Sequence, residues 1–174
     1  MAQDTSSPNQ NNDAAFTKGP ILTVAIWTFA AVIIDQCSKL FVRRALEFGE
    51  PHAVIEGWLY FTRAQNFGAA WSVLSGQRIV LVLVTLAVIG VLLGAAKELA
   101  SNGIAARIGL GLVLGGAFGN LIDRLLFGHV TDFIDMGSPW HWLATFPVFN
   151  IADSCLTVGA ILLALSFLLV KNTS

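Results

Sequence analysis

Charged residues are scarce in this chain of 174 residues: Asp, Glu, Lys and Arg together make up 12%, whereas hydrophobic residues make up 55%. The mean hydropathy of +0.71 excludes an ordinary soluble domain and indicates a membrane protein. The formal net charge of −1 leaves no excess of basic residues for binding nucleic acid. The length fits a single domain.

Signatures of nucleophilic or zinc-dependent catalysis are also lacking. Cys37 and Cys155 lie in apolar runs without the spacing of metal ligands, so we interpret them as small buried residues and not as a disulfide or metal pair. No serine or cysteine stands in a nucleophile signature with a histidine partner. The HExxH zinc motif is absent as well. Any catalysis by this chain must therefore depend on other side chains.

Four long apolar runs predict four transmembrane helices, because backbone polar groups in lipid must be hydrogen-bonded internally. The runs cover about residues 20–41, 79–96, 104–122 and 150–170, each near the length that crosses about 30 Å of hydrocarbon. Residues 1–18 are polar and low in complexity, and we expect this tail to be disordered. Residues 19–174 are then a single membrane-embedded domain.

The connections between these runs carry their own signals. The short connection 97–106 contains Ser-Asn-Gly, a helix stop, so the second and third helices are predicted to be antiparallel neighbours. The long connection 42–78 is rich in strand formers, with Gly57 as a turn, and predicts a small hairpin or sheet on the membrane face. Residues 69–74 are expected to form a short interfacial helix anchored by Trp71. The expected fold is an all-α membrane protein with these two additions.

Glycines at four-residue spacing predict close packing between helices. The third run carries Gly111, Gly115 and Gly119, and the second carries Gly90 and Gly94. We interpret all five as packing positions with no role in chemistry.

Four crossings would bring polar side chains from distant segments to one membrane side. The ends of the first and third runs, the start of the fourth run and the two long connections share that side, and together they contribute Asp35, Lys39, Asn66, Asn120, Asp123, Arg124, Asp132, Asn150 and Asp153. Such residues at a membrane edge are costly, so they indicate a functional site, although an ion-pair network for stability alone is an alternative. Basic residues divide almost evenly between the two sides and do not fix the orientation.

The spacing of these residues suggests acid–base chemistry. Asp35 and Lys39 are four residues apart and can pair along one helix. Asn150 and Asp153 share a helix face, and Asp132 comes from a loop on the same membrane side. Two carboxyl groups in a partly dry site share one proton, so one can activate water while the other acts as an acid, as in an aspartic protease. Asp135 would face the opposite side of an extended strand.

Two other functions fit the same residues. A small transporter or proton-pathway subunit would also use buried carboxylates, and it would cleave nothing. A metal-dependent membrane hydrolase could use His129, Asp132 and a second histidine such as His141, although no ligand motif supports it. We therefore expect neither a metal nor another cofactor.

Five blocks in order resemble the lipoprotein signal peptidases, also called signal peptidase II, a family of bacterial membrane aspartic proteases. The blocks are DQCSK from Asp35, NFGAAW from Asn66, GGAFGNLIDR from Gly115, VTDFI from Val130 and FNIAD from Phe149. Each block alone is weak, but five at fitting places among four apolar runs are specific. Residues 136–147, MGSPWHWLATFP, look long and aromatic for the family, and we expect them to lie at the headgroup level.

The resemblance implies a site, a substrate and a location. It makes Asp132 and Asp153 the catalytic dyad, and the supporting or substrate-binding residues would be Asp35, Lys39, Asn66, Gly68, Asn120, Asp123, Arg124 and Asn150. It implies cleavage of prolipoproteins on the N-terminal side of a lipobox cysteine that carries diacylglycerol. The chain would be a multi-pass protein of the bacterial inner membrane, in contact with lipid, with its active site facing the periplasm. We expect a monomer.

Overall fold

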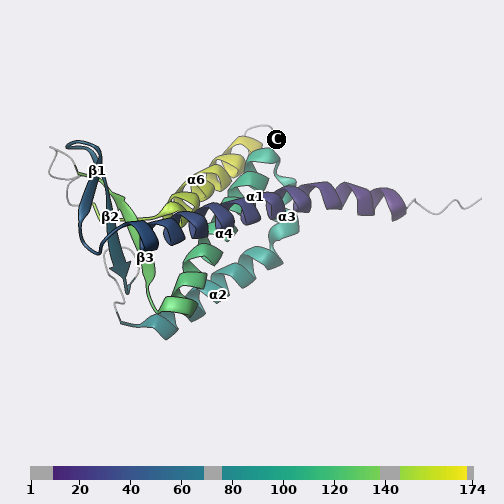
Figure 1. Ribbon diagram of the computed structural model, residues 1–174. Coiled ribbons are helices and arrows are strands. Elements are labelled where there is room, and N and C mark those ends of the chain that lie inside the picture. The colour runs from purple at the N-terminus through teal and green to yellow at the C-terminus, as the bar shows by residue number, and fades with distance from the viewer. Residues whose placement is uncertain (1–9, 69–75, 138–145, 172–174) are drawn as a thin grey trace, which may run out of the picture.

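The computed structural model describes the backbone of residues 10–68, 76–137 and 146–171, and side chains from residue 19 to residue 169 within these ranges. In chain order the elements are α1 (Gln10–Ala45), β1 (Pro51–Ile55), β2 (Leu59–Asn66), α2 (Arg78–Gly94), α3 (Ala96–Ser101), α4 (Ile104–Phe127), β3 (Val130–Asp135) and α6 (Ile151–Lys171). The helices form a bundle with the small sheet at one end, as Figure 1 shows.

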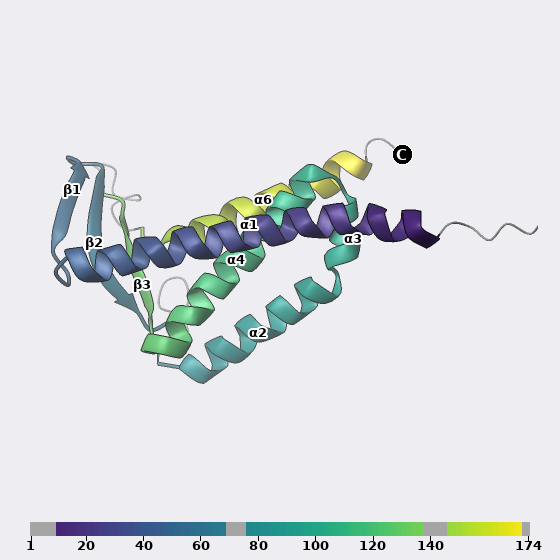
Figure 2. The same cartoon turned by 45° about the vertical axis from the view of Figure 1, so that its right-hand side comes forward.

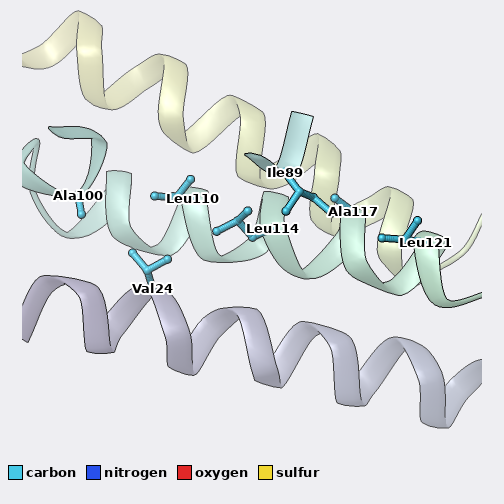
Figure 3. Packing of buried hydrophobic residues seen from close by; sticks show 7 residues of the cluster. All are labelled: Val24, Ile89, Ala100, Leu110, Leu114, Ala117 and Leu121. Atoms are coloured by element: carbon cyan, nitrogen blue, oxygen red, sulfur yellow. The ribbon is translucent and has the colours of Figure 1, made fainter. Parts of the chain in front are cut away.

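Helix α4 is the centre of the bundle. It packs against α1, α2, α3 and α6, and most residues of its apolar window are buried, whereas few residues in the windows of α1 and α6 are buried. Leu110, Leu114, Ala117 and Leu121 of α4 form one buried cluster with Val24, Ile89 and Ala100 from α1, α2 and α3 (Figure 3). The exposed faces of the outer helices are apolar, as expected of a protein surrounded by lipid.

The glycine prediction is confirmed for α4. A Cβ atom added to Gly115 would lie 2.5 Å from the Cβ of Ala31, and one added to Gly111 would lie 2.6 Å from the Cβ of Trp27. Only glycine therefore lets α1 approach α4 so closely. For Gly90 and Gly94 the prediction is wrong: an added Cβ would meet nothing within 4 Å, because these glycines face away from the bundle.

Three helices, over Gly19–Ala45, Ile104–Phe127 and Ile151–Leu169, are long and apolar enough to cross a membrane. The predicted second crossing corresponds to α2, which has 17 residues and a length of about 26 Å. Helix α3 occupies part of the stretch 97–106 that we expected to be a simple connection. Three helices are thus candidate crossings, and the fourth crossing stays a prediction.

The sheet contains the predicted hairpin and one strand that we did not predict. Strands β1 and β2 pair antiparallel around the turn at Gly57, whose φ is +76°. Residues 130–135, which we expected to be a loop, form β3 and pair antiparallel with β2. The free edge of β2 presents unpaired backbone N–H and C=O groups, and β3 pairs with them although it is more than 60 positions away in the sequence.

Several predicted boundaries and positions differ from the structure. Helix α1 begins at Gln10, inside the polar tail, and extends to Ala45, while α4 continues to Phe127, so Asp123 and Arg124 lie within a helix and not at its end. Cys37 is exposed on α1 and Cys155 is only partly buried, so their predicted burial is wrong. The predicted interfacial helix over residues 69–74 and most of the aromatic segment, residues 138–145, lie outside the described residues.

Candidate active site

The two candidate catalytic carboxyl groups meet through one asparagine. Asp132 is the third residue of β3, and Asp153 lies in the first turn of α6. The Nδ2 atom of Asn150 donates a hydrogen bond to Asp132 Oδ1 at 2.6 Å, while the backbone N–H of Asn150 donates to Asp153 Oδ2 at 3.2 Å. Residues from a strand and a helix are thus held together at the end of the bundle that carries the sheet (Figure 1).

Asn150 and Asp153 cap the start of α6 reciprocally. The backbone N–H of Asp153 donates to Asn150 Oδ1 at 2.9 Å, and the Asp153 carboxylate accepts the backbone N–H of Asn150 in return. This is the capping-box arrangement, which satisfies two donors that a helix start leaves unpaired. A carboxylate is also stabilised there by the helix dipole. The i, i+3 spacing in FNIAD therefore both starts the helix and fixes the Asp153 side chain.

Asp132 is almost completely buried between two amides. Its Oδ2 atom accepts a hydrogen bond from Asn66 Nδ2 on β2 at 3.0 Å, and its Oδ1 accepts the one from Asn150. The pKa of Asp132 is raised to about 7, first by burial and then by the nearby Asp153 charge, and the two amide hydrogen bonds and Lys39 act in the opposite direction. Near neutral pH, Asp132 therefore exchanges a proton readily, as acid–base catalysis requires.

Asn120 is oriented by a buried lysine. Its Oδ1 atom accepts hydrogen bonds from Lys39 Nζ at 2.9 Å and from Asn150 Nδ2 at 3.2 Å. The Asn120 amide nitrogen consequently points the other way and donates to Asp153 Oδ1 at 2.8 Å. Lys39 also pairs with Asp35 at 2.9 Å, which confirms the predicted i, i+4 pair.

Asp35 connects α1 to the first turn of α6. Its Oδ1 atom accepts the backbone N–H of Ala152 at 2.9 Å, and its Oδ2 atom accepts Gln36 Nε2 at 3.0 Å in addition to the lysine. A Cβ atom on Gly119 would lie 2.5 Å from Asp35 Oδ2, so the glycine leaves the space that this carboxylate occupies. Asp35 thereby fixes the helix start that carries Asp153.

Asp123 and Arg124 diverge although they are adjacent. Asp123 is fully buried and accepts the backbone N–H of Thr131 at 2.8 Å, with Arg43 and Lys39 as its cationic neighbours at 3.3 and 3.7 Å. Arg124 Nη2 instead donates to the carbonyl oxygen of Gly68 at 3.1 Å. All ten predicted site residues are thus joined by hydrogen bonds or ion pairs at one end of the bundle.

The loop after β2 is held by Asn66 and Arg124 together. Asn66 Oδ1 accepts the backbone N–H of Gly68 at 2.9 Å, an Asx-type contact that leaves Nδ2 free to donate to Asp132. The carbonyl of Gly68 is occupied by Arg124. Gly68 therefore contacts Asn66 and Arg124 through its backbone.

Asp135 and His129 lie beside the site and not in it. Asp135 accepts the hydroxyl of Thr62 at 2.8 Å, away from Asp132, as the strand alternation predicted. The ring of His129 packs against Phe67 and Phe127 at centroid distances of 5.4 and 6.3 Å. Among the described residues, no three His, Cys, Asp or Glu side chains are grouped as metal ligands. His141, the other histidine of the metal hypothesis, lies outside those residues.

Arg43 and Thr131 also belong to this network, although they were not predicted from the sequence. Arg43 Nη1 contacts both Asp123 Oδ1 and the hydroxyl of Thr131, the latter at 3.0 Å. A signal for Arg43 was present, because it follows Lys39 by four residues and so continues the helix face of Asp35 and Lys39. Thr131 gave no signal, since its contacts depend on the unpredicted strand β3.

Comparison with known proteins shows the family of this chain. Residues 27–169 match the family model described as "Signal peptidase (SPase) II". The chain is 44% identical over 138 residues to a lipoprotein signal peptidase of Geobacillus kaustophilus, covering 79% of this chain and 88% of that protein. A lipoprotein signal peptidase of Staphylococcus carnosus is 38% identical over 141 residues, covering 81% of this chain and 87% of that protein.

Solved structures give the same result. A structure described as a bacterial membrane enzyme, determined by the in meso method at 2.3 Å, matches with a TM-score of 0.78 and 36% identity, over 88% of this chain and 91% of that one. A second, described in the same words at 1.9 Å, matches with a TM-score of 0.76 and 35% identity, over 85% and 94% of the two chains. The apolar helices and these bacterial relatives indicate an integral membrane protein. On this evidence the chain belongs to the signal peptidase II family of aspartic peptidases.

Proposed function

We propose that this chain removes signal peptides from prolipoproteins, cutting on the N-terminal side of a cysteine that carries diacylglycerol, with Asp132 and Asp153 as its catalytic dyad. Family membership supports the reaction. The observation that carries the dyad is that these two carboxyl groups, from β3 and α6, are both held by Asn150, and that burial and the neighbouring charge raise the pKa of Asp132 to about 7.

The proposed chemistry uses one proton on the pair. The ionised carboxyl takes a proton from water as the water oxygen attacks the scissile carbonyl carbon, and the protonated carboxyl donates its proton to the carbonyl oxygen. The tetrahedral intermediate then collapses, the C–N bond breaks, and the amino group of the lipidated cysteine leaves with a proton from the pair. Because its pKa is raised, we take Asp132 as the initial proton donor and Asp153 as the base in this scheme.

The surrounding amides prepare the pair for this cycle. Asn66 and Asn150 donate to Asp132, and Asn120 donates to Asp153, so both carboxyl groups keep their orientation as the proton moves. Lys39 fixes the direction of the Asn120 amide, and Asp35 fixes the first turn of α6. Such preorganisation lowers the reorganisation that the transition state requires.

The position of the site fits a lipid-anchored substrate. Asp132 lies in β3 and Asp153 in the first turn of α6, and the sheet lies at one end of the helices (Figure 2). A diacylglyceryl group stays in the bilayer and holds the scissile bond close to the membrane surface. We therefore place the sheet and the dyad at the periplasmic face of the inner membrane, with α2 as a fourth crossing and the chain acting as a monomer.

The test is cleavage of a diacylglyceryl-modified prolipoprotein by the purified protein, followed on a gel. The wild-type protein is expected to give the shortened lipoprotein, and Asp153→Asn none. The same prolipoprotein without the lipid is expected to remain intact. Absence of cleavage by well-folded wild-type protein would contradict the proposal and favour the transporter or proton-pathway alternative.

A further inference from the structure

The residue before Asp132 is held at both its backbone and its side chain. Thr131, which is 2% exposed, donates its backbone N–H to Asp123 Oδ2 at 2.8 Å and accepts a hydrogen bond from Arg43 Nη1 on its hydroxyl at 3.0 Å. The same Nη1 atom lies 3.3 Å from Asp123 Oδ1. Residues from α1, α4 and β3 thus close a triangle, which we call the Thr131 clamp, directly beside the candidate dyad.

Arg43 is itself fixed within this clamp. Its guanidinium lies over the ring of Phe127, 4.5 Å from the centroid, and its side chain is only 16% exposed. Its backbone carbonyl accepts a hydrogen bond from Arg63 Nη1 of β2 at 3.1 Å. A planar guanidinium that stacks on a ring and hydrogen-bonds at its edge keeps one orientation, which an ammonium group does not.

The start of β3 needs such an anchor. Only Gly128, with φ of +80°, and His129 separate α4 from the strand, and β2 has a register irregularity between Phe61 and Ala64, next to the partner of Asp132. Neighbouring side chains of a strand face opposite sides, so a slip of one residue would turn Asp132 away from Asn66 and Asn150. Thr131 faces the clamp, while Asp132 faces the dyad.

We propose that Arg43 is a positioning residue for the peptidase reaction: through Thr131 it fixes the register in which β3 presents Asp132 to Asp153. This proposal rests on the proposed function. The simpler alternative is that Arg43 only balances the charge of Asp123. Lys39 Nζ lies 3.7 Å from Asp123 Oδ2 and already provides a cation for that purpose.

The test compares Arg43→Met and Thr131→Val with wild type in steady-state cleavage of a diacylglyceryl-modified prolipoprotein. Arg44→Met is the matched control, because it removes the same charge from the exposed adjacent position. We expect kcat to fall about tenfold to a hundredfold in both clamp variants, as misplacement of a reacting group by about 1 Å does, with KM within twofold of wild type. The double variant is expected to lose no more than the larger single loss, since both changes break one contact.

Thr131→Val keeps the Arg43–Asp123 pair and separates the two interpretations. Wild-type kcat in this variant, or losses that multiply in the double variant, would overturn the positioning role. If Arg43→Met does not fold, Thr131→Val alone decides, because it is nearly isosteric and removes only the hydroxyl. Failure of the proposed function would look different, since wild type and Arg44→Met would then also leave the prolipoprotein uncut.

Discussion

Replacing Asp132 by asparagine should abolish cleavage and, at the same time, stabilise the protein at alkaline pH. The folded-state pKa of about 7 lies above the ordinary value of 3.8, so the folded protein binds this proton more tightly than the unfolded chain does. The wild type must therefore lose stability as pH rises from about 4 to about 7, by roughly 4 kcal/mol in all. Asparagine cannot ionise, so the Asp132→Asn variant does not lose this stability as pH rises.

Most of that loss falls in a window that is easy to measure. Between pH 5 and pH 8 the same linkage gives about 3 kcal/mol, or roughly 5–10 °C in Tm for a chain of this length. The offset from a changed hydrogen bond to Asn66 or Asn150, about 1–3 kcal/mol, is the same at both pH values and cancels in the comparison. The Tm of Asp132→Asn minus that of wild type should therefore increase by this amount from pH 5 to pH 8.

The assay is thermal unfolding in one detergent at both pH values, combined with the prolipoprotein gel. Asp135→Asn is the control, because it makes the same chemical change three residues along β3, where the carboxylate accepts only the Thr62 hydroxyl among the described contacts. Its activity should be retained. A pH-independent difference for Asp132→Asn would refute the pKa reasoning, and near-normal turnover would refute the dyad.

Three other outcomes are expected. Activity should be complete in excess chelator, because no metal-ligand motif is present in the sequence; loss of activity that zinc restores would favour a site at His129. Asp123→Ala should lower stability by about 1–3 kcal/mol in thermal unfolding, because it leaves the Thr131 N–H unpaired; a fully stable but inactive variant would instead place Asp123 in the catalytic set. A Trp140→Ala, Trp142→Ala double variant should raise KM with little change in kcat if the aromatic segment guides the lipidated peptide; unchanged constants would make these residues membrane anchors only.

The helical part of the fold could be predicted because lipid imposes simple rules on sequence. Apolar runs of about 20 residues must be helices, and successive crossings must alternate, which is why Asp35, Asn120 and Asp153 could be placed together without knowledge of their contacts. The glycine spacing of α4 also has a simple physical cause, the close approach of α1. The same spacing in α2 has none, since spacing does not reveal which face of a helix meets a neighbour.

What could not be predicted depends on pairing across long sequence distances. Strand β3 forms because β2 offers an edge, and nothing within Val130–Asp135 alone distinguishes a strand from a loop. The Thr131 clamp could not be predicted for the same reason, because Thr131 lies in β3. The direction of the Asn120 amide is likewise decided by Lys39, 81 residues away, and not by its neighbours in GGAFGNLIDR.

The charges at the site explain why a buried cluster of this size is tolerated. Four carboxyl groups meet three basic side chains there, so full ionisation would leave one negative charge in excess; the residues are Asp35, Asp123, Asp132, Asp153, Lys39, Arg43 and Arg124. One proton removes the excess, and the pKa of about 7 makes Asp132 a site that can hold it. An aspartic dyad needs that same proton for catalysis. The proton that offsets the excess negative charge is thus the same proton that the proposed chemistry uses. Stability and activity should therefore fall together as pH rises above about 7.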